Sequence, residues 1–472
     1  MRATGAGDRQ GVGSVWGKLT RLSRLHPYPA MVADELALDL VRRYLPEGAT
    51  VLDPFCGSGR LLAAAKNATV RVGVDANPLA WLLTTAKLSN SAPGVVRSIA
   101  DDLVLAKRTA PSGVHLMAPG RQVEWFAPEI RHELGRIVAW INSLGLPDPE
   151  RHLVAAALSA TVREVSFARQ SGWKLHRRTA TEREGFSACP WERLERRLRY
   201  CEAEVRRAGC MPGRSYVALS RVASIRAHEH PVHALGPYGI VLTSPPYGDS
   251  RTTVQYGAAS ALCLSVVAQI DGLQQLAATG GEIDAQCLGG PAAGEGHREP
   301  NDLHRYWRGA REGRLAHAVA RFLSQYSEAC DAIVDCMSPG GTAVLVVGRR
   351  STGGRRVRLD DFTIEHLQAR GFELIDRTTR GLRQKRVPRR INRFGRSASP
   401  EMRERGAVVT MSSEIILVLR KTRANVACAG YGKRIRDMNS NAQPASTVTR
   451  HEPAFGSVPK ICSWSNPDAG PR

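Results

Sequence analysis

The 472-residue sequence contains no hydrophobic run long enough to cross a membrane. A membrane-spanning helix needs roughly 18 or more apolar residues, and the best candidate, 258–270, is shorter and includes serine and glutamine. Residues 1–25 carry arginine and glycine without an apolar core, which is not typical of a signal peptide. We therefore expect no membrane contact and a cytoplasmic location.

Paired cysteine motifs are also missing. The ten cysteines are scattered, none forms a CxxC pair, and no histidine spacing accompanies them. This pattern argues against a zinc site or a disulfide framework and favours reduced thiols. We expect no metal cofactor.

Acidic residues are few relative to basic ones. The chain has 44 Asp and Glu against 66 Lys and Arg, which gives a net charge of +22. Such an excess favours a polyanionic partner. An arginine-rich solvated surface would have the same composition, so charge alone does not decide between the two.

Hydrophobic periodicity predicts strands that alternate with helices. Apolar runs predict strands at 50–52, 70–74, 217–222, 239–243, 343–347, 372–377 and 414–419. Helical patterns occur at 32–44, 60–66, 78–88, 128–144, 150–168, 191–208, 316–337 and 361–370, and 279–302 is predicted to be a loop. This alternation is typical of an open α/β sheet.

Composition divides the chain into five segments. They are a flexible N-terminal arm (1–24), a first half of the α/β core (25–90), a helical insertion (91–211), a second half of the core (212–421) and a disordered tail (422–472). The motifs described next predict that the first half of the core binds a cofactor and that the second half is catalytic.

A glycine-bearing turn, Asp53-Pro-Phe-Cys-Gly57-Ser-Gly59, follows the first strand. Glycines let a ligand approach the backbone closely. A phosphate ligand does not fit, because no Gly-Lys-Ser/Thr ending follows and Asp53 would repel it. A carboxylate here suits a cation such as the α-amino group of S-adenosylmethionine. Asp75, at the end of the next strand, can accept hydrogen bonds from ribose hydroxyls.

A second unusual loop, Thr243-Ser244-Pro245-Pro246-Tyr247, follows the strand 239–243. Its prolines fix the backbone, so that the Ser244 hydroxyl and neighbouring carbonyls can accept hydrogen bonds from an exocyclic amine. Tyr247 offers a face for stacking an extruded base. A simple turn or a proline-rich ligand segment is the alternative interpretation. Both loops begin at strand carboxyl ends and are expected to face one cleft.

With these residues in place, the sequence resembles the DNA amino-methyltransferases over about residues 24–421. His26-Pro27-Tyr28-Pro29-Ala30 resembles their motif before the cofactor loop, and the two loops resemble their cofactor and catalytic motifs. The serine that opens the catalytic motif, together with 244–256, 289–290 and 410–414, resembles the cytosine-N4 branch.

The resemblance implies a seven-stranded class I (Rossmann-like) methyltransferase sheet with a large helical insertion. It implies transfer of a methyl group from S-adenosylmethionine to cytosine N4 in a specific duplex DNA sequence, at the nucleoid and beside a cognate restriction endonuclease. Adenine-N6 methylation, RNA-base methylation and a non-catalytic binding role stay open as alternatives. The implied catalytic residues are Ser244, Pro245, Pro246 and Tyr247, and the implied cofactor-binding residues are His26, Pro27, Tyr28, Asp53, Pro54, Phe55, Gly57, Gly59, Asp75, Ala76 and Asn77.

Two features depart from this family. The cofactor motif precedes the catalytic motif, whereas many enzymes with Ser-Pro-Pro-Tyr have the reverse order. Related enzymes often carry an acidic residue near the third strand that reads the cofactor adenine, and Ser220 stands at that place. Asp101 or Asp102 would substitute if 95–100 formed the third strand.

Basic residues beside aromatic ones suit contact with DNA phosphates and grooves. We expect DNA contacts from two basic clusters and from a residue just after the catalytic loop, although an ordinary helical surface would have a similar composition. The candidates are Trp173, Lys174, Arg177, Arg178, Arg251, Lys385 and Arg386.

Overall fold

The computed structural model describes residues 20–111, 124–170, 175–248, 256–290, 306–307, 314–352, 355–382, 390–391, 408–409 and 413–422. All of them belong to one compact unit, Met1–Thr422. Of the predicted tail, 423–472 lies outside the described residues. In the described part of the chain, no helix is both long and apolar enough to cross a membrane.

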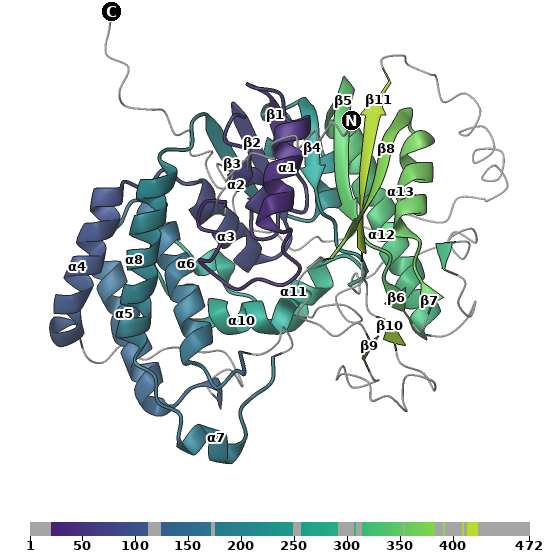
Figure 1. The fold of residues 1–472 in the computed structure, drawn as a ribbon. Helices are drawn as coiled ribbons and strands as arrows, with labels where there is room; N and C mark the ends of the chain where they lie inside the picture. Colours follow the sequence, from purple (N-terminus) through teal and green to yellow (C-terminus); the bar gives the residue numbers. More distant parts are fainter. Residues whose placement is uncertain are drawn as a thin grey trace, which may run out of the picture. The chain divides into compact units, whose positions relative to one another are not determined.

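Seven strands form the central sheet in the order β3-β2-β1-β4-β5-β11-β8 (Figure 1). Neighbours from β3 to β5 are parallel, and β11 is antiparallel to both β5 and β8. This order, in which the antiparallel β11 lies between β5 and β8, is that of a Rossmann-like methyltransferase sheet. It confirms the predicted fold class. The strands are β1 (Thr50–Asp53), β2 (Val70–Asp75), β3 (Arg214–Leu219), β4 (Tyr238–Thr243), β5 (Met337–Val347), β8 (Phe372–Gly381) and β11 (Ser413–Lys421).

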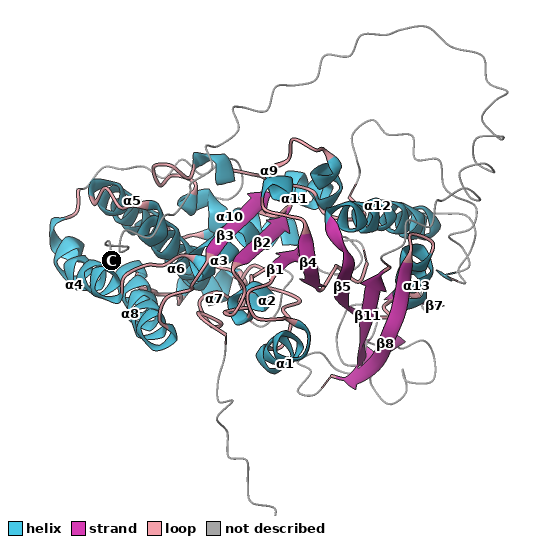
Figure 2. Ribbon diagram, turned by 90° about the horizontal axis from the view of Figure 1, so that it is seen from above, coloured by secondary structure: helices cyan, strands magenta, loops and turns pink. Residues whose placement is uncertain are grey.

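Both faces of this sheet are buried, because side chains along a strand alternate between its two sides. Val51 and Val344 pack on the face that carries α1 (Asp34–Tyr44) and α2 (Arg60–Ala64). Leu52 and Leu345 pack on the opposite face, against α12 (Arg314–Cys336) and α13 (Leu359–Gln368). Figure 2 shows the helices on the two sides of the strands.

A separate hydrophobic cluster holds the helices between β2 and β3. Proline at the first turn starts several of them, where its missing N–H costs no hydrogen bond. Their largest fully buried side chain is Trp191, whose Nε1 donates to Glu133 over 2.5 Å. These helices are α3 (Pro78–Leu88), α4 (Pro93–Thr109), α5 (Pro128–Ser143), α6 (Asp148–Val165), α7 (Ala180–Glu184) and α8 (Pro190–Ala208).

Helix α10 (Tyr256–Val267) connects this cluster to the half of the chain that is predicted to be catalytic. Its residues Leu262 and Val266 belong to the same hydrophobic cluster as Leu158 of α6. The predicted insertion therefore packs against the helix that resumes shortly after the second loop. The remaining short elements are α9 (Pro231–Ala234), α11 (Gly280–Gln286), β6 (Ser351–Thr352), β7 (Arg355–Arg356), β9 (Arg390–Ile391) and β10 (Val408–Val409), with 3₁₀ helices at Val222–Arg226 and Gln274–Leu276.

Three sequence-based predictions of local structure are wrong. Part of the predicted loop 279–302 is α11, whose capping box pairs Thr279 with Glu282 and satisfies backbone groups at the helix start. Strand β5 begins at Met337 and includes Pro339-Gly340-Gly341, whereas the predicted strand begins at residue 343. The alternative third strand at 95–100 lies inside α4.

Residues 20–24 were assigned to the flexible arm, but the structure places most of them in the core. Leu22 is fully buried, and both the backbone N and the hydroxyl of Thr20 donate to Asp34. Residues 1–19 lie outside the described residues. The segment that leads into His26 is thus anchored to α1.

Candidate active site

The glycine turn after β1 has a backbone that only glycine adopts without strain at two positions. Gly57 has φ of +51° and Gly59 has φ of +75°. A Cβ on Gly59 would lie 2.7 Å from the Thr84 hydroxyl, and one on Gly57 would lie 3.6 Å from the ring of Tyr28. The turn is therefore closely packed beneath Gly59, while Gly57 faces Tyr28.

The Asp75 carboxylate ties this turn to β2. It accepts hydrogen bonds from the backbone N of Gly57 at 2.8 Å and of Asn77 at 2.9 Å. Burial raises the pKa of Asp75 to about 6. The sequence predicts that Asp75 binds a ribose. It does not predict the hydrogen bond between Asp75 and the glycine turn, because that bond depends on β1 and β2 being neighbours in the sheet.

One buried hydrogen bond joins the two predicted loops. The Thr243 hydroxyl, at the end of β4, donates to the Asp53 carboxylate at the end of β1 over 2.6 Å. Both residues are buried, and their strands are adjacent and parallel. The Phe55 backbone N donates to the same carboxylate over 3.2 Å. The two loops therefore meet at one edge of the sheet, as predicted.

Burial also makes Asp53 and Asp75 easy to protonate. It raises the pKa of Asp53 to about 7, and the nearby Asp75 charge acts in the same direction. No Lys, Arg or His among the described residues lies within ion-pair distance of either carboxylate. A desolvated carboxylate without a cation favours its neutral form unless a cationic ligand is present.

The Ser-Pro-Pro-Tyr loop places two hydroxyls together. Ser244 Oγ lies 3.2 Å from the Tyr247 hydroxyl and also donates to the Val346 carbonyl at 3.3 Å. The Tyr247 hydroxyl in turn donates to Glu414 on β11 over 3.2 Å. Pro245 is buried, whereas Ser244 and Tyr247 are partly exposed. Glu414 is missing from the predicted site residues, because its strand follows some 170 residues later in the sequence.

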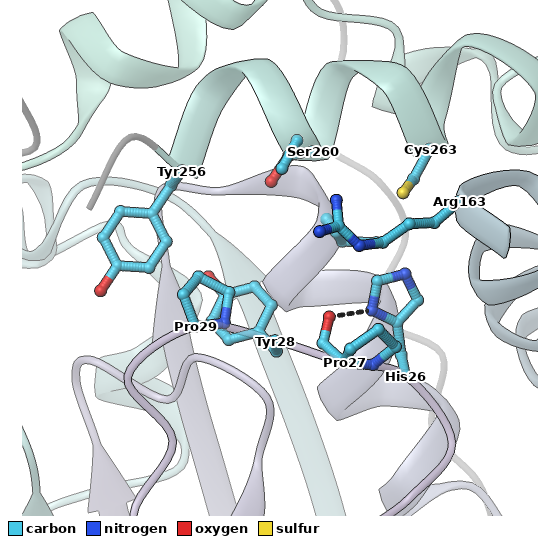
Figure 3. A pocket seen from close by; sticks show the side chains of 10 residues that line it. His26, Pro27, Tyr28, Pro29, Arg163, Tyr256, Ser260 and Cys263 are labelled. Carbon is cyan, nitrogen blue, oxygen red and sulfur yellow. Dashed lines mark hydrogen bonds between the residues drawn. The ribbon is translucent and has the colours of Figure 1, made fainter. Parts of the chain in front are cut away.

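A pocket lies between the segment 26–29 and helices α6 and α10 (Figure 3). Asn77 Nδ2 donates to the Tyr28 hydroxyl at 3.2 Å and to Ser260 Oγ at 2.9 Å, which connects β2, this segment and α10. The rings of Tyr28 and Tyr256 are 5.9 Å apart. Tyr28 separates the pocket from the glycine turn.

His26 lines this pocket with a neutral imidazole ring. It is buried, and its Nδ1 lies 2.6 Å from the Pro27 carbonyl oxygen. Burial lowers the pKa of His26 to about 3, and the charges of Arg163 and Arg197 act in the same direction. Figure 3 shows the Arg163 side chain from α6 facing this ring.

The predicted cofactor residues thus gather around the carboxyl ends of β1 and β2. Pro54 is buried, Ala76 is half-buried, and Phe55 packs half-buried against the cluster on the α12 face. The structure brings together the turn, the acidic strand end and the segment that contains Tyr28.

The predicted DNA contacts are only partly described. Arg177 is exposed and bonds to Glu124 at 2.9 Å, and the Arg178 guanidinium lies 4.5 Å from the centre of the Phe186 ring. The other five candidates, Trp173, Lys174, Arg251, Lys385 and Arg386, lie outside the described residues.

Asp101 and Asp102, the suggested substitutes for an adenine-reading carboxylate near the third strand, make other contacts. Asp101 bonds to Arg199 at 2.6 Å, and Asp102 accepts from the Trp140 indole at 2.8 Å, both on α4. The true third strand, β3, ends just before Ser220, whose backbone N donates to the Asp75 carbonyl at 3.0 Å. The substitution by Asp101 or Asp102 is therefore wrong.

A known protein family matches the beginning of the chain. Residues 6–79 match the model of the N6/N4 methyltransferase family, which is described as DNA methylase. Over this stretch the chain is similar to the DNA amino-methyltransferases.

A curated relative matches most of the chain. The Type II methyltransferase M.MvaI of Kocuria varians is 26% identical over 428 residues, which cover 84% of this chain and 90% of the relative.

Solved structures match weakly. The rRNA methyltransferase aviRa from Streptomyces viridochromogenes is 11% identical, with 84% of this chain and 88% of that chain covered and a TM-score of 0.31. A second structure of that enzyme is 13% identical, with 72% and 91% covered and a TM-score of 0.27. Scores this low do not bear on the fold, which rests on the strand order.

Gly59→Ala should destabilise the protein through the glycine turn. The added methyl group would overlap Thr84 and would sit on left-handed backbone, so we expect the free energy of unfolding to fall by about 2 kcal/mol. Gly94→Ala is the matched control, since nothing lies within 4 Å of its added Cβ and the residue is in a helix. Urea unfolding of both variants measures the difference, and equal stabilities would contradict the described packing.

Proposed function

We propose that this chain transfers a methyl group from S-adenosylmethionine to the exocyclic N4 of cytosine in a specific duplex DNA sequence, as the modification enzyme of a restriction-modification system. The observation that carries the proposal is the Thr243–Asp53 hydrogen bond. It sets the Ser-Pro-Pro-Tyr loop directly beside a glycine turn that begins at the buried Asp53 and is bonded by the half-buried Asp75 of β2.

The residues at the strand ends fit this cofactor. Asp53 and Asp75 are desolvated carboxylates without a described cation, and a ligand with a positively charged amino group would compensate them. Gly57 leaves open backbone opposite Tyr28 that a larger residue would fill. His26, Pro27, Pro54, Phe55, Gly59, Ala76 and Asn77 complete the proposed cofactor residues. When bound, the cofactor supplies an electrophilic methyl group on a sulfonium.

The Ser-Pro-Pro-Tyr loop suits an amine nucleophile. The Ser244 hydroxyl and the carbonyls of Ser244 and Pro245 would accept the amine hydrogens and draw its lone pair out of conjugation with the ring. Pro245 and Pro246 keep these acceptors in a fixed backbone. Tyr247 would stack on the extruded base. Because the methyl donor is cationic and the amine can lose its proton after attack, no strong general base is required.

Cytosine N4 is favoured over adenine N6 by the serine that opens the catalytic motif and by the resemblance of the surrounding segments to the N4 branch. The Kocuria varians relative is a Type II methyltransferase, which supports a modification enzyme that is paired with an endonuclease. Adenine N6 differs only in the ring that carries the amine, so it is the competing product in the test below.

DNA docking would use the insertion and the segments around it. Arg177 is exposed, and its surface ion pair with Glu124 is of a kind that contributes little, so a phosphate could displace it. We propose Arg177 and Arg178 as phosphate contacts, together with Trp173, Lys174, Arg251, Lys385 and Arg386.

Cofactor affinity should depend on pH through Asp53. Below about pH 7 the free carboxyl is protonated and cannot pair with an ammonium, so affinity should rise as pH increases towards 7. It should fall again above about pH 8, where an α-amino group loses its proton. Calorimetric Kd values from pH 5.5 to 8.5 test this dependence. Asp53→Asn should bind at least about tenfold more weakly, and its acidic limb should move down to about pH 6, where Asp75 still titrates. A wild-type Kd that does not change with pH would count against the assignment.

The methylated product identifies the reaction. Plasmid DNA incubated with the enzyme and methyl-labelled S-adenosylmethionine should yield N4-methylcytosine on nucleoside analysis. N6-methyladenine would replace the cytosine assignment, and unlabelled DNA would reject the proposed function. Tyr247→Ala should reduce the rate about 100-fold or more with cofactor affinity retained, since stacking with a base contributes about 1–3 kcal/mol and correct placement adds to it.

A further inference from the structure

The hydroxyl of Tyr247 is held from a distant part of the chain. Its partner is Glu414 Oε1, 3.2 Å away, at the start of β11. A second contact comes from Ser244 Oγ on the other side, at 3.2 Å. A tyrosine ring turns about two side-chain bonds only, and a hydrogen bond at its hydroxyl fixes the direction in which the ring points. Because the phenolic O–H prefers to lie in the ring plane, an acceptor at a fixed place also favours one orientation of that plane.

Glu414 is itself fixed in place. It lies directly opposite Arg380 in the antiparallel pairing of β11 with β8, and the Arg380 guanidinium is 3.5 Å from its Oε2. The Glu414 side chain is only 13% exposed, whereas that of Arg380 is 32% exposed. Cross-strand pairs of this kind hold both partners in register. The carboxylate is thus presented to Tyr247 by the strands at the sheet edge.

At its antiparallel end the sheet contacts the Ser-Pro-Pro-Tyr loop in addition to burying a hydrophobic core. One oxygen of Glu414 faces Tyr247 and the other faces Arg380. Ser244 and Tyr247 are tied to β5 and β11 respectively, so both ends of the loop are braced by strands that follow it in sequence.

We propose that Glu414 is a positioning residue, which acts through the Tyr247 hydroxyl to set the ring plane against which the target base stacks, with Arg380 holding the carboxylate. The inference rests on the proposed function, because it assumes that Tyr247 stacks on a base. Glu414 makes no contact with the reacting atoms in this account. A hydrogen-bond acceptor of the same length should therefore replace it.

The test compares single-turnover methylation rates of Glu414→Ala, Glu414→Gln, Tyr247→Phe and the double variant Tyr247→Phe/Glu414→Ala. Glu414→Ala and Tyr247→Phe should each slow methylation about tenfold, since small displacements of a positioned group are costly. Glu414→Gln should stay within about threefold of wild type. The double variant should be no slower than either single variant, because both remove the same contact.

Cofactor Kd and melting temperature are measured for every variant, with Glu373→Ala as the matched control. Glu373 is an exposed acidic residue on β8, and its loss should leave rate and binding unchanged. Cofactor Kd should also be unchanged in the Glu414 variants, which a general loss of structure would not allow.

Three results would overturn the inference while the wild type still methylates DNA. They are a full rate in Tyr247→Phe, additive effects in the double variant, and a Glu414→Gln rate as low as that of Glu414→Ala. The last result would indicate that the charge or proton of Glu414 is used directly. If the wild-type enzyme itself methylates no DNA, the proposed function fails first, and that outcome is distinct from the other three.

Discussion

The hydrogen bond from Thr243 to Asp53 makes one site out of two loops that are 190 residues apart in sequence. It exists because β1 and β4 are parallel neighbours and both loops leave the same edge of the sheet. Ligands in open α/β sheets bind at this edge, where the strand order reverses. Asp53 is buried, so its carboxylate depends on such donors to remain usable for a cation.

The surrounding packing supports that bond. Asp75 holds the glycine turn from one side, and Tyr28 lies over Gly57 from the other. Asn77 joins Tyr28 to Ser260, so α10 is attached to the same network. The helical insertion packs on α10 through its own hydrophobic cluster. The Ser-Pro-Pro-Tyr loop, the glycine turn and the insertion are therefore connected through a few buried polar contacts.

Much of this arrangement could be predicted from the sequence. The periodicity of apolar residues identified the sheet strands, and the glycines and prolines after β1 and β4 marked the two loops. The resemblance to DNA amino-methyltransferases correctly anticipated the fold class, which the strand order shows. The predictions that failed concern local structure. Helix α11 was missed although Thr279 and Glu282 form a capping box. The start of β5 was missed because the strand contains a Pro-Gly-Gly sequence, which ordinarily indicates a turn. Contacts such as Tyr247 with Glu414 could not be predicted, since they depend on the register of β11 rather than on any local pattern.

The link between the two loops can be tested by the affinity of Thr243 variants for S-adenosylmethionine. Thr243 ends β4, the strand that leads into the Ser-Pro-Pro-Tyr loop. A site made of independent loops would leave cofactor binding unaffected by its replacement. Calorimetric titration at pH 7 should show about tenfold weaker binding for Thr243→Val, which loses a donor to a charged group, and near-normal binding for Thr243→Ser, which keeps it. Equal affinity in Thr243→Val and the wild type would contradict the account.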